Sequence, residues 1–255
     1  MTPAVLLIAD ISGYTRFVRE HATAADHARR IVVSLLRAMI DASEPPLRVA
    51  ELEGDAVFFY ALAEDGDVQA VADAVRRQIP RLFEAFVAAR AREHEATECP
   101  CPACSNIGGL ELKQVAHTGE VAVETIGPFE KLFGLDVIVV HRLLKNSVPA
   151  TRYVLQSEAA ERVLGPPPVE PRAVERRREP VEGLGEMEVT VYILDGDGGA
   201  GAEGDDGAEA GAGARSNTSS AAAARDGAKR HGAAVDGPPG NSWLGRVRAW
   251  LRGSA

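Results

Sequence analysis

The sequence predicts an α+β fold with a ferredoxin-like core, in which helices pack on a mixed β-sheet. Three observations indicate this fold: short apolar runs typical of strands, longer segments with apolar residues at helical spacing, and an element order that begins β-α-β-β-α. The 255-residue chain is 45% hydrophobic, which is enough to bury a full core. Because the composition changes abruptly near Asp195, we expect one globular domain over residues 1–195.

The first half of this domain is predicted to contain a strand, a helix and a hairpin. Val5–Ala9 is a continuous apolar run, as expected of a buried strand. Apolar residues then recur at helical spacing over residues 28–39, until two prolines interrupt the pattern. The apolar runs at 47–52 and 56–60 predict two strands joined by a tight turn at Gly54.

A second helix and several further elements complete the predicted domain. The helix starts near Asp67 and keeps its apolar period to Phe86, although we expect Pro80 to kink or divide it. The remaining elements are a second hairpin, formed by residues 110–117 and 121–123, and a third helix at 137–144. Two late strands follow, at residues 153–155 and 187–194.

Two carboxylates lie beside predicted strands. Asp10 ends the first strand, and Asp55 follows the turn of the hairpin. If these strands pair in one sheet, the two side chains come together, and adjacent carboxylates repel each other unless a hard cation lies between them. Mg²⁺ is typically bound by one or two carboxylates together with substrate phosphates. The alternative is that the acids of the hairpin tip are simply solvated.

Two short motifs carry a resemblance to a known family. Residues 10–15 read Asp-Ile-Ser-Gly-Tyr-Thr, and residues 51–56 read Glu-Leu-Glu-Gly-Asp-Ala. They resemble the Asp-Ile-x-Gly-Phe-Thr signature and the second metal motif of class III nucleotidyl cyclases. The resemblance extends over about residues 4–194 and is weaker outside these motifs.

The resemblance implies a class III nucleotide cyclase fold with a two-metal site for Mg or Mn. Asp10, the carbonyl of Ile11 and Asp55 would hold the ions, which bind the phosphates of a purine nucleoside triphosphate. It also implies a homodimer, because cyclases of this class usually form their sites at the subunit interface with residues from both chains.

Other positions of the family site are only partly matched. Residues 134–142 align with the family motif Gly-x-x-Val-Asn-x-Ala-x-Arg, which puts Arg142 in the place of the arginine that stabilises the transition state. Ile138 stands in the place of the asparagine, and Leu184 in the region of a late phosphate-binding lysine. A plain helix-surface role for Arg142 is the alternative.

The residues that would read the base are also mixed. Glu51 stands where guanylyl cyclases carry a purine-reading glutamate, and its partner position, Lys131, matches neither the adenylyl nor the guanylyl class. Two functions therefore remain open. The chain either binds a purine nucleoside triphosphate and forms a cyclic nucleotide, or it is a degenerate cyclase-homology domain that serves as a dimerising regulatory or nucleotide-binding module.

A cysteine-bearing loop is expected over residues 94–109. Cys99, Cys101 and Cys104, with His94 just upstream, make a candidate set of ligands for a structural zinc ion. The gap between the first two cysteines is shorter than in an ordinary zinc knuckle. Reduced thiols without a metal and a redox or interchain role are the alternatives. This stretch also resembles a bacterial cyclase-like family of unassigned function.

Charge and hydropathy exclude some classes of function. A net charge of −9 and a pI near 5.3 argue against a general nucleic-acid-binding surface, which needs clustered Lys and Arg. The N-terminus has no basic leader, and no segment approaches the roughly 20 apolar residues of a membrane span. We therefore expect a cytoplasmic protein.

The C-terminal part has a different composition. Residues 196–241 are rich in Gly, Ala and Asp and predict a disordered linker. Residues 242–255 predict a basic amphipathic helix that docks on an anionic membrane surface, where the protein would be peripheral, or in a groove of a partner protein. The alternatives are docking on the chain's own acidic domain and a frayed tail.

Overall fold

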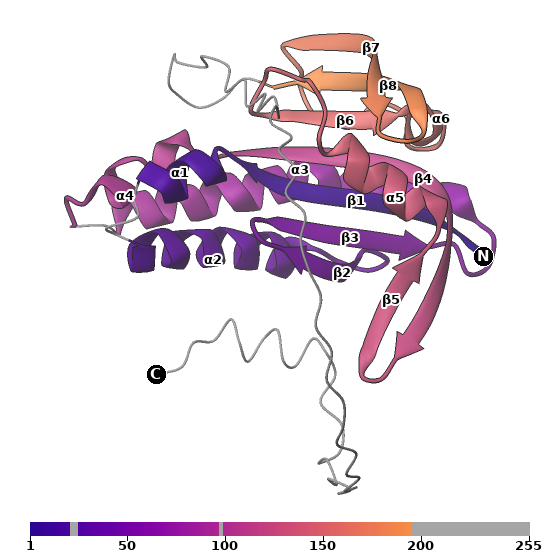
Figure 1. The fold of residues 1–255 in the computed structure, drawn as a ribbon, viewed down its shortest axis with the longest axis horizontal. Helices are drawn as coiled ribbons and strands as arrows, with labels where there is room; N and C mark the ends of the chain where they lie inside the picture. The colour runs from indigo at the N-terminus through magenta and orange to yellow at the C-terminus, as the bar shows by residue number, and fades with distance from the viewer. Residues whose placement is uncertain (21–24, 97–98, 195–255) are drawn as a thin grey trace, which may run out of the picture.

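The computed structural model describes residues 1–20, 25–96 and 99–194. The predicted linker at 196–241 and the helix at 242–255 lie outside the described residues. The described part forms one sheet with strand order β2-β3-β1-β4-β6-β8-β7, with helices on both faces (Figure 1). Because β4 and β6 are parallel while the other pairs are antiparallel, the sheet is mixed, and the predicted α+β fold with helices packed on a mixed sheet is confirmed.

The elements have the following bounds. The strands are β1 (Thr2–Ser12), β2 (Arg48–Glu53), β3 (Ala56–Leu62), β4 (Glu111–Ile126), β5 (Phe129–Phe133), β6 (Tyr153–Ser157), β7 (Ala173–Val181) and β8 (Gly185–Ile193). The helices are α1 (Tyr14–Glu20), α2 (Ala25–Ala42), α3 (Val68–Glu95), α4 (Pro102–Ser105), α5 (Leu135–Leu143) and α6 (Glu158–Leu164), with a 3-10 turn at Ile107–Gly109.

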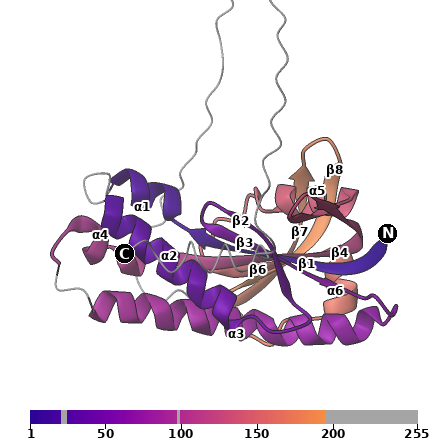
Figure 2. The ribbon, with the colours of Figure 1, turned by 90° about the horizontal axis from the view of Figure 1, so that it is seen from below.

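Strand β1 lies in the middle of the sheet between β3 and β4, and its side chains alternate between two buried layers. Leu7 and its odd-numbered neighbours pack against α2 and α3, while Leu6 and Ile8 pack in the layer that contains α5. Figure 2 shows α3 and α5 on opposite sides of the sheet. Because both faces are covered, β1 is a continuous apolar run, and Asp10 at its end is on the α5 side.

The structure corrects the predicted hairpin around residues 118–120. Strand β4 runs without a break from Glu111 to Ile126, and the chain reverses only after it, into β5. Gly119 stays within the strand because the carboxyl group of Asp136 occupies the space beside it. A Cβ at position 119 would lie 2.0 Å from Asp136 Cγ, so the glycine allows a close approach rather than a turn.

Two other elements differ from expectation. Helix α3 is a single helix of 28 residues in spite of Pro80, because its apolar face, with Ile79 and Leu82 fully buried, keeps it on the sheet. The sequence does not predict strand β7, because consecutive charged residues, among them Arg176–Arg178, replace the usual alternation of apolar and polar residues. The strand lies at the edge of the sheet. Charged side chains are common on edge strands, where they oppose pairing with other chains. None of the helices in the described ranges is long and apolar enough to cross a membrane.

Candidate functional site

The structure brings the two predicted metal ligands, Asp10 and Asp55, to the same end of adjacent strands. Asp10 pairs with Ala56 in the antiparallel register of β1 and β3, and the backbone N–H of Ile11 donates to the Asp55 carbonyl at 3.3 Å. Burial, and secondarily the negative charge of Asp10, raises the pKa of Asp55 to about 6. We call these two residues the aspartate pair.

A lysine that the sequence analysis missed lies against the aspartate pair. Lys113 is directly opposite Asp10 on β4, and its Nζ is 3.0 Å from Asp10 Oδ2. Burial alone would lower the pKa of Lys113, but Tyr153, Asp10 and Asp55 outweigh this effect and raise it. A stable cation therefore faces the pair. The available signal was the only lysine in the predicted strand at 110–117, because lysines are rarely buried unless they are paired.

The two positions predicted to read the base contact each other. Lys131 on β5 forms an ion pair with Glu51 on β2. Beside this pair is a hollow of about 190 Å³, which is lined by Lys131, Glu130 and the mainly apolar residues Ala50, Tyr60, Val123, Pro128 and Leu132. A mainly apolar hollow with a few polar groups is typical of small-molecule sites.

Arg142 lies against the turn between β7 and β8. Its Nη1 is 3.0 Å from the place where a Cβ of Gly183 would be, and Gly183 has a φ of +73°. Leu184 is the next residue in this turn. Ile138 and Leu184, at two positions where the resemblance implies polar residues, are 46% and 41% exposed, so both apolar side chains face solvent.

Helix α5, which carries Arg142, is held to the sheet at both ends. At its start, Asp136 accepts a hydrogen bond from the backbone of Glu120 at 2.7 Å and contacts His117 Nε2 at 2.9 Å. Near its end, His141 contacts a carboxylate oxygen of Glu53 at 2.7 Å. These contacts position the helix between β4 and the hairpin that carries Asp55.

The contact between His117 and Asp136 has a third member that resembles a catalytic triad. Ser157 Oγ lies 2.7 Å from His117 Nδ1. However, Ser157 is 1% exposed, and its hydroxyl accepts the backbone N–H of Ala160 at the start of α6. A serine that caps a helix inside the core has no access to a substrate, so we assign this group a structural role.

The three cysteines lie together with a histidine from another part of the chain. His27 on α2 joins Cys99, Cys101 and Cys104, and the four ligand atoms all lie within 4.8 Å of one another. We call this group the cysteine cluster. A hydrogen bond from the backbone of Cys104 is the main cause that lowers the pKa of Cys101 to about 6. Three cysteines and a histidine could hold a metal ion such as zinc.

The histidine of the cysteine cluster is not the one expected from the sequence. His94 lies exposed in the last turn of α3 and is not one of the four grouped residues. The prediction relied on nearness along the chain, whereas α2 reaches the cysteines only through the packing of α2, α3 and α4. Nothing in the local pattern around His27 connects it with residues 99–104.

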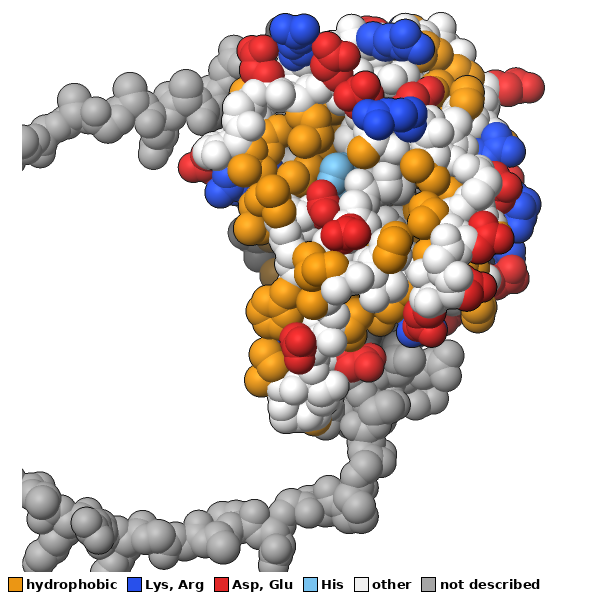
Figure 3. Space-filling view, turned by 90° about the vertical axis from the view of Figure 1, so that its right-hand side faces the viewer, with side chains coloured by type: hydrophobic (Ala, Val, Ile, Leu, Met, Phe, Trp, Pro, Cys, Tyr) orange, Lys and Arg blue, Asp and Glu red, His pale blue; other side chains and the backbone are white. Residues whose placement is uncertain are grey.

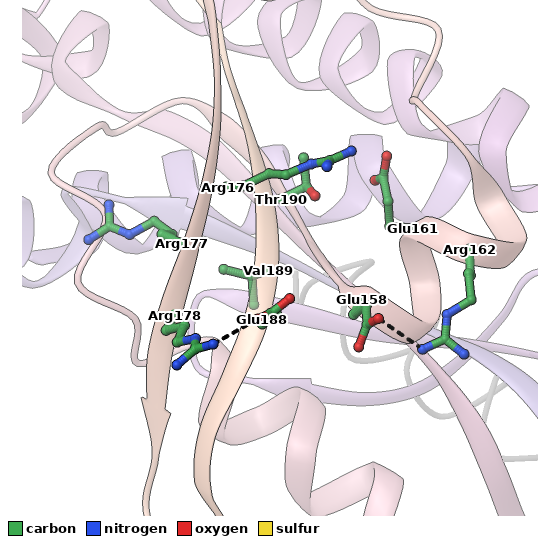
Figure 4. Close-up of a pocket in the computed structure, with 9 residues that line it drawn as sticks. All are labelled: Glu158, Glu161, Arg162, Arg176, Arg177, Arg178, Glu188, Val189 and Thr190. Carbon is green, nitrogen blue, oxygen red and sulfur yellow. Dashed lines mark hydrogen bonds and ion pairs between the residues drawn. The ribbon is translucent and has the colours of Figure 1, made fainter.

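A larger hollow of about 480 Å³ lies between α6 and the β7–β8 edge, away from the aspartate pair (Figure 4). Four of its charged side chains pair with one another, at 3.2 Å between Arg178 and Glu188 and at 3.3 Å between Arg162 and Glu158. Because acidic and basic side chains are mixed around it, this hollow has no clear preference for a triphosphate.

Comparison with known proteins places the chain in a family. A model described as "Protein of unknown function (DUF2652)" matches residues 32–153. The "Uncharacterized protein Rv2561/Rv2562" of Mycobacterium tuberculosis is 33% identical over 166 residues, which is 64% of this chain and 72% of that protein. The chain belongs to this uncharacterised family. The aspartate pair and the cysteine cluster of this chain both lie within the residues that the structure describes.

This chain has the fold of class III nucleotidyl cyclase domains. The adenylyl cyclase CyaB from P. aeruginosa superposes with a TM-score of 0.54 at 16% identity, over 76% of this chain and 95% of that one. The guanylyl cyclase Cya2 superposes with a TM-score of 0.54 at 15% identity, over 76% of this chain and 96% of that one. A "Class III adenylyl cyclase-like ATP-binding protein" from Pseudomonas aeruginosa superposes with a TM-score of 0.51 at 20% identity, over 64% of this chain and 34% of that one. At these identities the likeness concerns the fold.

Proposed function

We propose that this protein binds a purine nucleoside triphosphate together with Mg or Mn ions at a class III cyclase-type site. The observation that carries the proposal is the aspartate pair. Folding buries Asp55 and holds it near Asp10, and both effects oppose ionisation of Asp55, which costs stability when no cation is bound. Carboxylate oxygens are the ligands that Mg²⁺ and Mn²⁺ prefer, so the donor set fits such ions.

Each residue at this end of the sheet has a distinct task in the proposal. Asp10, Asp55 and the carbonyl of Ile11 would hold the metal ions, which neutralise phosphate charge when bound. Lys113 offers its ammonium group beside them, and a triphosphate would compete with Asp10 for this cation. Arg142, placed by α5 and the β7–β8 turn, would supply a planar guanidinium to the phosphates.

The base would bind near Glu51 and Lys131. In the metal-free protein these side chains neutralise each other beside the apolar hollow. A guanine ring could take the place of Lys131 at Glu51, because its N1–H and 2-amino group both donate to a carboxylate. Glu51 therefore favours GTP over ATP in this proposal.

A homodimer is part of the proposal. The apolar patch consists of large side chains on the β4–β5 arm and α5 that are 46–58% exposed: Ile126, Phe129, Phe133, Leu135 and Ile138. Figure 1 shows the ends of β4 and β5 extending beyond the sheet, and Figure 3 shows apolar side chains gathered on this side of the molecule. Contiguous exposed apolar surface is typical of protein interfaces. Dimerisation through it would complete sites with residues from two chains.

The second candidate function is a regulatory module that binds the nucleotide without turnover. Ile138 and Leu184 favour it, because neither side chain can orient a ribose or a phosphate by hydrogen bonding. Positioning and charge stabilisation supply most of the catalysis in phosphoryl transfer, so these two losses lower turnover far more than binding. The ATP-binding cyclase-like protein among the structural neighbours is a precedent for binding by this fold.

One experiment tests both candidates. The full-length protein is titrated calorimetrically with GTP or ATP in the presence and absence of Mn²⁺, and the products are analysed by mass spectrometry. Asp10→Asn removes a proposed ligand, while Asp65→Asn changes an exposed aspartate at the other end of β3. Metal-dependent binding that only Asp10→Asn abolishes supports the proposal. A cyclic nucleotide then identifies a cyclase, and its absence identifies the regulatory module. Equal binding by both variants, or no binding to wild type, refutes the site.

A further inference from the structure

The cysteine cluster lies in the helical layer, at the connection between α3 and β4. We propose that His27, Cys99, Cys101 and Cys104 bind one zinc ion, which ties this connection to the start of α2. The proposal does not depend on the nucleotide site, because it concerns different residues and a different kind of metal ion.

The distances within the cluster agree with a tetrahedral zinc site. His27 Nδ1 lies 3.4 Å from Cys101 Sγ and 3.5 Å from Cys104 Sγ. A tetrahedral ion with Zn–S bonds of about 2.3 Å and a Zn–N bond of about 2.05 Å separates nitrogen from sulfur by about 3.5 Å. The histidine and two of the thiols therefore already have the spacing that ligation requires.

The kind and number of ligands select the metal. Three sulfurs and one imidazole nitrogen are soft or borderline donors, which favour zinc over the Mg or Mn proposed at the aspartate pair. Four protein ligands fill a tetrahedral site and leave no position for a substrate, which is typical of a structural rather than a catalytic zinc ion. None of the three cysteines is in a disulfide, and a disulfide would use only two of them.

The location of the cluster explains what the ion would stabilise. Helix α4 is only four residues long, and the 3-10 turn that follows after Asn106 has three residues, so these elements have little stability of their own. They are nevertheless packed into the core through Ala103 and Ile107, both fully buried. A link from His27 to three cysteines would anchor this short segment to an 18-residue helix.

The anchored segment also contacts the loop that follows β1, the strand that contains Asp10. A Cβ at Gly13, whose φ is +85°, would lie 3.1 Å from the carbonyl oxygen of Gly109. Because Gly13 follows β1 directly, the cluster and the end of that strand are connected through backbone packing. Loss of the ion is therefore expected to loosen α1 and α4 before the central sheet.

The test compares two histidine variants of the full chain. Reduced, metal-free protein is titrated with Co²⁺, whose absorption spectrum reports tetrahedral geometry and thiolate ligation, and the zinc content of untreated protein is measured by mass spectrometry. Wild type and His94→Ala are expected to bind one equivalent with three sulfur ligands and one nitrogen. His27→Ala is expected to bind at least tenfold more weakly. His94 is the matched control because it is an exposed histidine outside the cluster.

A second variant keeps the test decisive if His27→Ala does not fold. His27→Cys retains four ligands and should give a Co²⁺ spectrum with more intense sulfur charge transfer than wild type, because a fourth thiolate replaces the imidazole. An unchanged spectrum of His27→Cys refutes the proposed ligand set. Wild type that binds no Co²⁺ at one equivalent, or a His94→Ala variant that loses binding, refutes the proposal as well.

Discussion

Replacing Asp55 with asparagine is expected to stabilise the metal-free protein at neutral pH while abolishing its response to metal and nucleotide. Asparagine has nearly the same shape but carries no charge that Asp10 can repel. The native state holds a proton on Asp55 more tightly than the unfolded chain does, because burial and Asp10 raise its pKa. The stability of wild type therefore falls as the pH rises through this range, and the stability of the variant does not.

The size of the effect follows from the pKa. A rise from 3.8 to about 6 corresponds to about 3 kcal/mol at 1.4 kcal/mol per pH unit. The side chain is only partly buried, so solvent screening reduces this to roughly 1–1.5 kcal/mol. For a domain of this size, that is a rise in Tm of roughly 3–5 °C. The difference should be absent near pH 4, grow through pH 6 and remain constant above it.

The assay is urea unfolding in EDTA at several pH values between 4 and 8, beside Asp65→Asn as an exposed control. In a second series, Mn²⁺ and GTP should raise the Tm of wild type and the control but not that of Asp55→Asn. Equal stability of Asp55→Asn and wild type across this range, or a difference between them that does not grow from pH 4 to pH 7, would refute the reasoning that burial and Asp10 raise the pKa of Asp55.

Two further changes test the placement of α5 and the apolar patch. Gly119→Ala should lower the free energy of unfolding by about 1–3 kcal/mol, because its Cβ would overlap the carboxyl group of Asp136. Gly108→Ala, where no atom lies within 4 Å, is the control in the same urea titration. Phe133→Glu should convert the proposed dimer to a monomer in sedimentation velocity experiments, whereas Val174→Glu, on β7, should leave it dimeric. A dimer that persists in Phe133→Glu would show that the interface lies elsewhere.

The main strands and helices could be predicted because their signals are local. Val5–Ala9 is apolar throughout since β1 is buried on both faces, and the helical period of α2 and α3 is visible within a few turns. Pro80 did not prevent the prediction of this helix, because the apolar period continues on both sides of the proline. The prediction of a hairpin at 118–120 was wrong because a glycine between polar residues is typical of a turn. In the structure, Gly119 is explained by the carboxyl group of Asp136, which leaves no space for a side chain at this position.

The order of the central elements, the resemblance to class III cyclases, and the motifs that contain Asp10 and Asp55 are all visible in the sequence. Which side chains meet became clear only from the fold. It placed Lys113 against Asp10, paired Glu51 with Lys131, and brought His27 rather than the nearer histidine to the cysteines. The physical reason is one of range. Backbone preferences and hydrophobic periodicity act over a few residues, whereas contacts between distant side chains depend on how the whole sheet and its helices pack.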